Sequence, residues 1–231
     1  MQRIRHWLFD LDDTLYPADA GLFPLVSRRI TERIAAHLGL PLEEARALQR
    51  RYWREYGTSL RGMIVRHGLD PEPFLAYVHD VPVEDVLAPD PALAAVLARL
   101  PGRCHVFTNG PAEFVRRVLR ALELEDSFER IFDIRHAGFV PKPNVEPYER
   151  VLAAIGEPGT AFVLVDDSPQ NLEPARARGM TTVWLRSPTS VVGGSAGNTV
   201  ALAEAARHAD VTIDRLADLE AGVRAYLSGR G

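Results

Sequence analysis

The chain has 231 residues, of which 46% are hydrophobic, and its formal net charge is −4. This length and composition are sufficient for the buried core of one large domain, or of one domain with an insert, and they exclude a disordered chain. The acidic balance provides no basic face for a nucleic-acid backbone or an anionic membrane, so we expect the partner to be a small molecule.

Six short apolar runs rich in β-forming residues predict a sheet, and amphipathic helical segments lie between them. The runs cover residues 3–9, 103–108, 130–135, 161–165, 181–185 and 210–213. The helical segments between the runs, and after the last one, carry single apolar stripes, for example at Phe114, Val115, Val118, Leu119 and Leu122. Alternation of this kind predicts an α/β fold with a Rossmann-like parallel sheet.

Residues 16–84 interrupt this alternation, because they contain no convincing strand. Leu22, Val26, Ile30, Ile34 and Leu38 follow a four-residue step, and Ala45, Leu48, Tyr52 and Tyr56 form a second helical stripe. We therefore predict a helical cap domain over 16–84, inserted into a core domain formed by 1–15 and 85–231. The polar stretch 187–199 is predicted to be a surface loop.

The cysteine and histidine content limits the kind of metal site. Cys104 is the only cysteine, which excludes an internal disulfide framework and a cysteine-based zinc cluster, and the seven histidines are scattered. We expect any bound metal to be a hard cation with oxygen ligands. No apolar run is long enough to span a bilayer, and the first residues turn acidic where a signal peptide needs its apolar stretch, so a cytoplasmic location is expected.

Polar motifs follow the predicted strands where each strand ends. They are DLDDTL at 10–15, TNG at 108–110 and DDSPQN at 166–171, with PKP at 141–143 preceding a helix. Ligands of an open parallel sheet bind beyond the carboxyl ends of the strands, so we expect these motifs to meet in one crevice. Asp and Thr also cap helices and form turns, but four such motifs in order are poorly explained by capping alone.

Carboxylates in this set are suited to phosphoryl transfer. Asp10 is the candidate nucleophile, since a carboxylate at a strand end can attack phosphorus and form a mixed anhydride. Asp12 is the candidate acid and base, and neighbouring carboxylates with a bound phosphate favour its neutral form by raising its pKa. Asp167, Asp10 and the backbone carbonyl of Asp12 suit octahedral Mg²⁺, with Asp166 supporting the metal directly or through water. Asp13 is interpreted as a turn or surface residue.

The remaining motif residues are candidates for phosphate binding. Thr108 and the backbone N–H groups near Asn109 and Gly110 are predicted to bind phosphate oxygens, and Lys142 to place a positive charge beside the nucleophile. Among 27 basic residues Lys142 is the only lysine. Its retention between two prolines suggests that this position does not tolerate the larger guanidinium group.

The motifs and their order resemble the haloacid dehalogenase superfamily of phosphatases over essentially the whole chain. DLDDTLYP is similar to its first motif, the threonine of FTNG to its second, the KP pair to its third and VDDSPQN to its fourth. The helical insert is placed like that family's cap of the first type. The resemblance implies Asp10 as nucleophile, Asp12 as acid and base, and Asp167 as metal ligand. Asn171 stands where many members carry a further acid.

A narrower resemblance concerns the substrate. YWREYGTSLRGM at 52–63, together with FTNG and VDDSPQN, is similar to the pyrimidine 5′-nucleotidase group. Tyr52, Tyr56 and Arg61 are candidates for a base or ribose pocket, because aromatic faces stack on nucleobases and arginine pairs with oxyanions. Tyr52 and Tyr56 fit a plain helical core stripe equally well.

We therefore expect a Mg²⁺-dependent phosphomonoesterase that forms an aspartyl-phosphate, with a pyrimidine nucleoside 5′-monophosphate as the implied substrate. A phosphomutase, a phosphatase acting on a phosphosugar, and a non-catalytic module that binds phosphate and a regulatory partner are the alternatives. Dehalogenation is disfavoured, because Asp12 has no evident task in that reaction. The sequence leaves the oligomeric state open.

Overall fold

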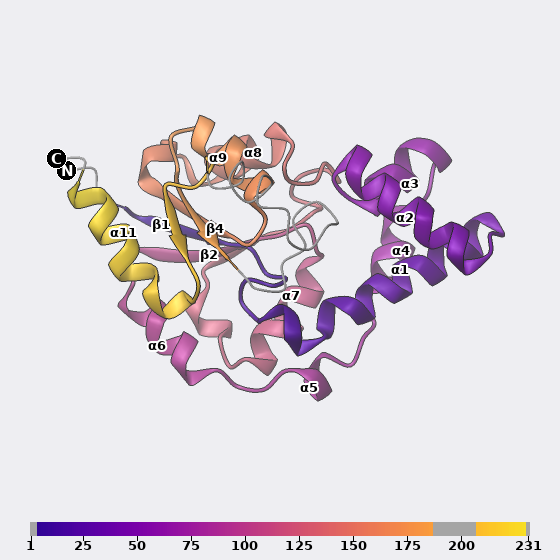
Figure 1. Ribbon diagram of the computed structural model, residues 1–231, viewed down its shortest axis with the longest axis horizontal. Coiled ribbons are helices and arrows are strands. Elements are labelled where there is room, and N and C mark those ends of the chain that lie inside the picture. The colour runs from indigo at the N-terminus through magenta and orange to yellow at the C-terminus, as the bar shows by residue number, and fades with distance from the viewer. Residues whose placement is uncertain (1–3, 187–206, 230–231) are drawn as a thin grey trace.

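Six parallel strands form a single sheet in the order β3-β2-β1-β4-β5-β6 (Figure 1). The computed structural model describes residues 4–186 and 207–229. The strands are β1 (His6–Phe9), β2 (Arg103–Phe107), β3 (Arg130–Phe132), β4 (Phe162–Asp166), β5 (Thr181–Leu185) and β6 (Val211–Ile213). Each lies within or overlaps a predicted run, so the predicted Rossmann-like parallel sheet is confirmed. The loop predicted at 187–199 lies outside the described residues.

The central strands are buried on both faces, and their side chains alternate between two hydrophobic clusters. Trp7 and Phe9 of β1 enter one cluster, whereas Leu8 enters the other. Val163 and Leu164 of β4 divide in the same way. This explains why the runs are apolar throughout rather than alternating, as expected for a parallel sheet covered on both sides.

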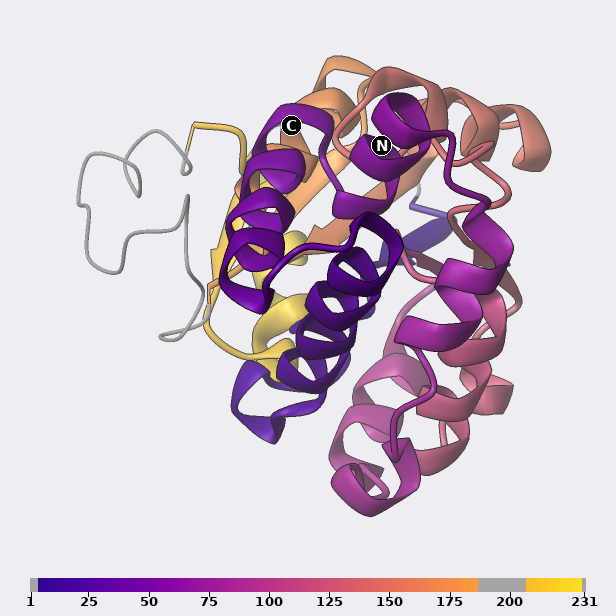
Figure 2. The same ribbon diagram turned by 90° about the vertical axis from the view of Figure 1, so that its right-hand side faces the viewer.

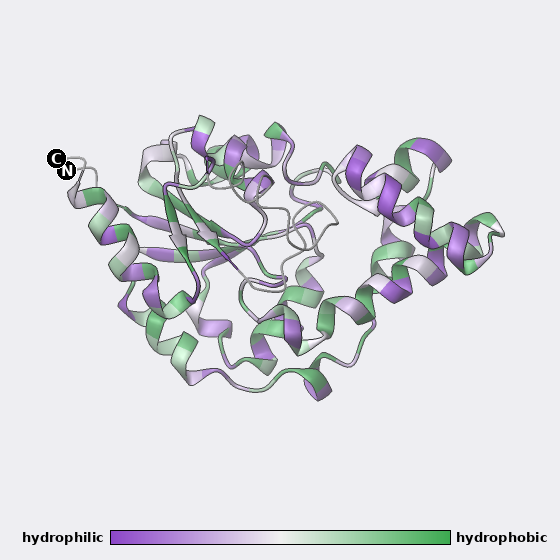
Figure 3. Cartoon of the chain, viewed as in Figure 1, coloured by the Kyte–Doolittle hydropathy of each residue, from purple (hydrophilic) through white to green (hydrophobic). Residues whose placement is uncertain are grey.

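Helices cover both faces of the sheet (Figure 1). One face carries α6 (Pro91–Arg99), α7 (Ala112–Ala121) and α11 (Leu219–Ser228), and the other carries α8 (Val145–Ile155) and α9 (Pro169–Ala177). Short 3-10 turns occur at Ala18–Ala20, Glu125–Ser127, Gly159–Ala161 and Leu216–Asp218. In Figure 3 the long helices carry both hydrophobic and hydrophilic residues, as expected for helices that bury one face.

Four helices between β1 and α6 form the helical insert, which lies at one end of the sheet in Figure 1 and in front of the sheet in Figure 2. They are α1 (Leu22–Leu38), α2 (Leu42–Tyr56), α3 (Ser59–His67) and α4 (Pro71–Val78), and the short α5 (Val83–Val86) follows on the way back to the core. The insert has a hydrophobic cluster of its own, which includes Met63 and Phe74 and also reaches Ile134 of the core. The beginning of α1 packs differently, because Leu22 and Val26 belong to the core cluster.

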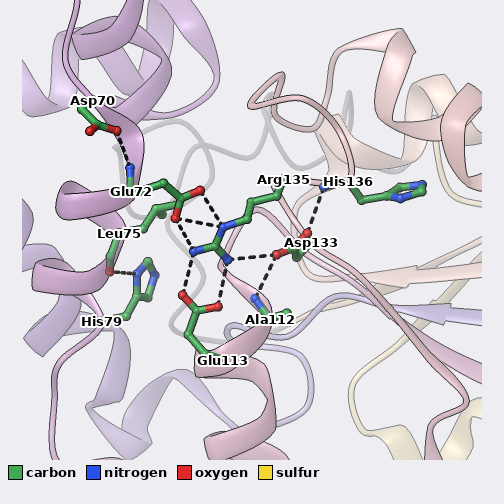
Figure 4. Close-up of polar contacts among 9 residues, drawn as sticks. All are labelled: Asp70, Glu72, Leu75, His79, Ala112, Glu113, Asp133, Arg135 and His136. Carbon is green, nitrogen blue, oxygen red and sulfur yellow. Dashed lines mark hydrogen bonds and ion pairs between the residues drawn. The ribbon is translucent and has the colours of Figure 1, made fainter.

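The cap and the core are joined by an ion-pair network centred on Arg135, which follows β3 (Figure 4). Its guanidinium group contacts Glu72 of α4 at 2.7 Å and Glu113 of α7 at 2.8 Å. The same group lies 3.3 Å from Asp133, whose Oδ2 accepts the backbone N–H of Ala112 at the start of α7. A connected set of charges thus runs from the cap to the helix that follows the TNG motif.

Among the described residues, no helix combines the length and apolar character that crossing a membrane requires. The longest, α1, mixes apolar and charged residues along its 17 residues.

Candidate active site

The sheet order creates a crevice at the carboxyl end of β1. Strand β1 lies between β2 on one side and β4 on the other, so the strand order reverses direction at β1. Open α/β sheets bind ligands at such a reversal. Phe9 pairs with Val106 and with Val165, so Asp10, which directly follows β1, lies beside Asp166. Strand register alone therefore brings the first and fourth motifs together.

Lys142 is inserted between these two carboxylates. Only 2% of Lys142 is exposed, and its Nζ lies 2.7 Å from Asp166 Oδ2 and 3.0 Å from Asp10 Oδ1. The ammonium group also donates to the carbonyl of Phe107, at 2.8 Å. Burial alone would lower the pKa of Lys142, but the two carboxylates raise it above its ordinary value, so this side chain stays charged.

Asp166 is fully occupied by protein groups. It is completely buried, and its Oδ2 accepts Lys142 while its Oδ1 accepts the backbone N–H of Ser168 at 2.9 Å. The side-chain amide of Asn171 donates to both oxygens, at 2.9 and 3.0 Å. These bonds orient Asp166 toward the lysine, and they give Asn171 a role that the sequence motif did not reveal.

Asp10, Asp166 and Asp167 form a group of carboxylates suited to a hard cation. Each offers an oxygen atom, and these atoms lie within 4.8 Å of one another. Burial, together with the neighbouring carboxylates, raises the pKa of Asp10 to about 7 even though Lys142 opposes this shift. Burial also raises the pKa of Asp167 well above its ordinary value.

This excess of buried negative charge fits a divalent cation with oxygen ligands. Asp166 is already engaged by Lys142 and Asn171, so Asp10 and Asp167 have more free oxygen atoms than Asp166, and their roles as metal ligands stay predictions. The expected contribution of the Asp12 backbone carbonyl and the supporting role of Asp166 stay predictions.

The TNG motif follows β2 and is held by its own side chains. Thr108 is buried, and its hydroxyl oxygen accepts the N–H of Gly110 at 3.0 Å, which leaves the hydroxyl hydrogen free to donate. Asn109 Oδ1 accepts a hydrogen bond from the backbone N–H of Lys142 at 2.8 Å, and Asn109 Nδ2 donates one to the backbone carbonyl of Lys142 at 3.2 Å. The asparagine side chain thus fixes the backbone of the lysine loop, a function that the motif alone did not predict.

Asp12 accepts a hydrogen bond from Tyr16, a residue for which the sequence predicted no role. The hydroxyl of Tyr16 donates to Asp12 Oδ1, and only 2% of Tyr16 is exposed. Burial raises the pKa of Asp12, although the tyrosine hydrogen bond opposes the shift. The four-residue spacing was the available signal, since the N–H of Leu15 bonds to the carbonyl of Leu11 and closes one helical turn.

The three predicted cap residues lie in different surroundings. Tyr52 is buried in the cap cluster, and its hydroxyl is 2.7 Å from Nε2 of His67, an arrangement that fits its interpretation as a core residue. Tyr56 is partly buried and packs edge-on against Tyr52. Arg61 is partly exposed in the first turn of α3.

The turn between α2 and α3 lies against the lysine loop. Gly57 has a positive φ of 83°, and a Cβ atom there would be 3.2 Å from the carbonyl oxygen of Lys142 and 3.1 Å from Pro141. This contact places the C-terminal end of α2 beside the third motif. Tyr56 is therefore the predicted cap residue adjacent in sequence to the cap–core contact.

These features define a class of protein: an α/β core with an aspartate directly after its first strand, a buried lysine beside that aspartate, and a helical insert after the first strand. A family model described as haloacid dehalogenase-like hydrolase matches residues 4–179. The chain belongs to this family of hydrolases, and the resemblance seen in the motifs is confirmed.

Individual proteins similar to this chain share only a modest sequence identity with it. A yeast protein, "Phosphate metabolism protein 8" of Saccharomyces cerevisiae, is 26% identical over 75% of this chain, and the match spans 59% of the yeast protein's length. The haloacid dehalogenase-type phosphatase of Thermococcus onnurineus has a similar structure, with a TM-score of 0.56 and 22% identity over 94% of this chain and 96% of its own. L-2-haloacid dehalogenase from Xanthobacter autotrophicus also has a similar structure. Its TM-score is 0.56 and its sequence identity is 17%, over 96% of this chain and 99% of its own. At these identities the two structures support the fold alone.

Proposed function

We propose that the protein is a Mg²⁺-dependent phosphomonoesterase that uses Asp10 as its nucleophile. The observation that carries the proposal is the position of Asp10, 3.0 Å from the buried ammonium of Lys142 and grouped with Asp167. Dianionic phosphate and a carboxylate repel each other, so such a nucleophile needs positive charge on more than one side. Mg²⁺, when bound by Asp10 and Asp167, supplies that charge and lowers the repulsion.

The reaction divides into two displacements. Asp10 attacks phosphorus, the bond to the leaving oxygen breaks, and Asp12 donates a proton to that oxygen. Lys142 and the hydroxyl of Thr108 hold the phosphoryl oxygens. Asp12 then takes a proton from water as the water oxygen attacks phosphorus, and Asp10 is released as a carboxylate with free phosphate.

Asp12 separates this chemistry from the dehalogenation performed by one structural relative. A halide leaves as a stable anion and needs no proton, whereas an alkoxide leaving group does. The carboxyl group of Asp12 has a pKa raised by burial and lies two residues after the nucleophile. Both features support phosphate ester hydrolysis.

For the substrate we propose a pyrimidine nucleoside 5′-monophosphate. The support is the resemblance carried by residues 52–63 and the contact of Gly57 with the lysine loop, which brings the end of α2 toward the reacting centre. Tyr56 and Arg61 are the cap residues proposed to meet the nucleoside. Tyr52 is proposed to support Tyr56 from behind, against which it packs edge-on.

Phosphate release from a panel of nucleoside and sugar monophosphates tests the proposal. We expect Mg²⁺-dependent turnover, highest with pyrimidine nucleotides, and its loss in Asp10→Asn. Asp126→Asn, at an exposed position of the 3-10 turn Glu125–Ser127, makes the same chemical change outside the crevice and is the control that should retain activity. No release of phosphate from any member of the panel would contradict the proposal, and transfer of the group to a second sugar would favour a mutase.

Metal binding has a test of its own that does not depend on turnover. Mg²⁺ at 100 times its Kd should stabilise the folded protein by about 2.7 kcal/mol, which thermal unfolding with and without EDTA would show as a higher Tm. Asp167→Asn should remove this stabilisation. An unchanged response in that variant would exclude Asp167 as a ligand.

A further inference from the structure

Tyr16 ends a run of three buried residues, 14–16, that follows the aspartates of the first motif. The residues after Asp10 make a single helical turn, with hydrogen bonds from the N–H groups of Thr14 and Leu15 to the carbonyl of Leu11. That turn returns Tyr16 to the side of Asp12, four residues earlier. The ring packs in the core cluster, while the hydroxyl reaches Asp12 Oδ1.

This single hydrogen bond makes the two oxygens of Asp12 inequivalent. Oδ1 accepts the phenolic hydrogen, so a proton carried by the neutral carboxyl belongs on Oδ2. A side chain with free rotation about its last torsion would present either oxygen to the substrate. A rigid, buried donor instead fixes which oxygen takes part in proton transfer.

We propose that Tyr16 is a positioning residue that aligns Asp12 for proton transfer to the leaving group. This inference rests on the proposed phosphatase activity and adds a residue to it. In the first displacement the proton moves from Asp12 Oδ2 to the leaving oxygen while the phosphorus–oxygen bond breaks. The hydrogen bond from Tyr16 to Oδ1 then stabilises the carboxylate that remains.

In the second displacement the same oxygen works in reverse. Asp12 Oδ2 takes a proton from water as the new phosphorus–oxygen bond forms and the bond to Asp10 breaks. Tyr16 keeps its own proton throughout and touches neither the substrate nor the phosphoryl group. Its effect is therefore confined to steps in which Asp12 gives or receives a proton.

A purely structural tyrosine has a different signature. If the hydroxyl only satisfies a buried polar group, its removal lowers the amount of folded enzyme, or all rate constants together. If it aligns the acid, its removal penalises substrates in proportion to how much protonation their leaving group needs. Aryl phosphates of similar size, from p-nitrophenyl to unsubstituted phenyl phosphate, span that requirement.

The experiment compares wild type and Tyr16→Phe by kcat/KM on this series, with an alkyl phosphate at its end. The ratio kcat/KM reports only the steps up to departure of the leaving group, so the later attack of water does not enter. We expect about tenfold or greater loss for phenyl and alkyl phosphate and less than about twofold loss for p-nitrophenyl phosphate. Ratios between substrates are independent of the folded fraction, so a partly unfolded variant remains informative.

Two further variants complete the test. Tyr148→Phe removes another buried hydroxyl, which donates to the carbonyl of Asn171 at 2.7 Å and not to Asp12. Any loss it causes should be equal across the series. In an Asp12→Asn background the additional change Tyr16→Phe should leave the substrate ratios unaltered, because the group that Tyr16 aligns has been removed.

An equal loss for every leaving group in Tyr16→Phe, or no loss at all, would overturn the inference while the phosphatase proposal stands. The same holds if Tyr16→Phe alters the substrate ratios equally with and without Asp12. A wild-type protein that hydrolyses no member of the series would overturn the proposed function and this inference with it.

Discussion

Lys142 illustrates how one residue sets the charge balance of the crevice. Its ammonium group is buried between Asp10 and Asp166 and is further held by the carbonyl of Phe107. Removing one partner from a buried ion pair leaves the other charged and without compensation, which is more costly than the pair is favourable. The lysine is thus required by the folded core as well as by the proposed chemistry.

Replacement of Lys142 by methionine should therefore lower both stability and activity. We expect the free energy of unfolding, measured by urea denaturation, to fall by about 3–5 kcal/mol. Arg116→Met, at an exposed position of α7, is the control and should change stability by less than about 0.5 kcal/mol. A Lys142→Met protein as stable as the control would show that the carboxylates do not depend on the ammonium.

For single residues, the sequence predicted where the site residues lie better than it predicted their hydrogen-bond partners. Asp10, Thr108 and Asp167 could be selected because they follow apolar runs, and parallel strands end at one edge of a sheet. The hydrogen bonds of Tyr16 and Asn171 could not be predicted, because they depend on side-chain direction within irregular turns. The catalytic roles assigned to these residues stay predictions.

Among the elements, the turn between α2 and α3 connects the cap to the lysine loop. Gly57 occupies it with a φ of 83°, and its missing side chain leaves room for Pro141 and the backbone of Lys142. Gly68 ends α3 with a φ of 62°, but among the described residues no atom outside its own stretch of chain lies within 4 Å of the position of its absent Cβ. The two glycines share a positive φ and differ in what surrounds them.

This pair allows the contact to be tested separately from backbone strain. Gly57→Ala and Gly68→Ala should each cost about 1–2 kcal/mol of stability, because alanine is disfavoured at positive φ. Only Gly57→Ala should also lower kcat/KM for the preferred phosphate ester, by displacing the lysine loop from the cap. Equal activity in the two variants would mean that the contact does not matter for turnover.

The elements themselves were predictable to different degrees. Strands and most core helices could be predicted, because each has an apolar pattern that burial requires. A helix between the runs 161–165 and 181–185 was expected from the alternation, but no apolar stripe identified α9, since it begins at Pro169, contains Pro174 and has only a weak stripe. Its position is set by packing against β4 and β5, which local sequence does not encode.

For the molecule as a whole, the two ends of the sheet differ in their polar groups. The carboxyl end holds the acidic crevice, while the start of β1 and the middle of β2 hold His6 and His105, with ring nitrogens 3.1 Å apart. Burial lowers the pKa of His105 from 6.5 to about 4, and the nearby His6, Arg130 and Arg103 act in the same direction against Glu129. A buried imidazole of this kind is stable only when neutral.

Acid should therefore destabilise the fold before the carboxylates of the surface titrate. Because the folded-state pKa lies below the unfolded value, the contribution of His105 is fully present above pH 6.5 and is lost as pH falls toward 4. Burial also lowers the pKa of His79 to about 4, so the difference between wild type and variant is needed to isolate His105.

Urea denaturation of His105→Gln between pH 7 and pH 4 provides that difference. We expect the variant to lose less stability over this interval than wild type. His37→Gln, at an exposed position of α1, should follow the wild-type curve. Parallel curves for wild type and His105→Gln would show that the His105 ring does not govern acid sensitivity.

The ion pairs between residues far apart in the chain could not be predicted from the sequence. The insert could be predicted because it interrupts the strand–helix alternation, but the network of Arg135 joins residues 63 and 22 positions away in the chain. Arginine and glutamate are common on solvent-exposed helices, so no local pattern distinguishes these from the others.

The single, deeply buried lysine has a practical consequence for chemical labelling. Amine-reactive acylating reagents attack only the neutral amine, and in the folded protein this side chain is both shielded from solvent and kept protonated by its carboxylate neighbours. With no other lysine in the chain, acylation at that position would mark a molecule that has opened or unfolded. Mass spectrometry of the labelled peptide would then count such molecules without any engineered probe.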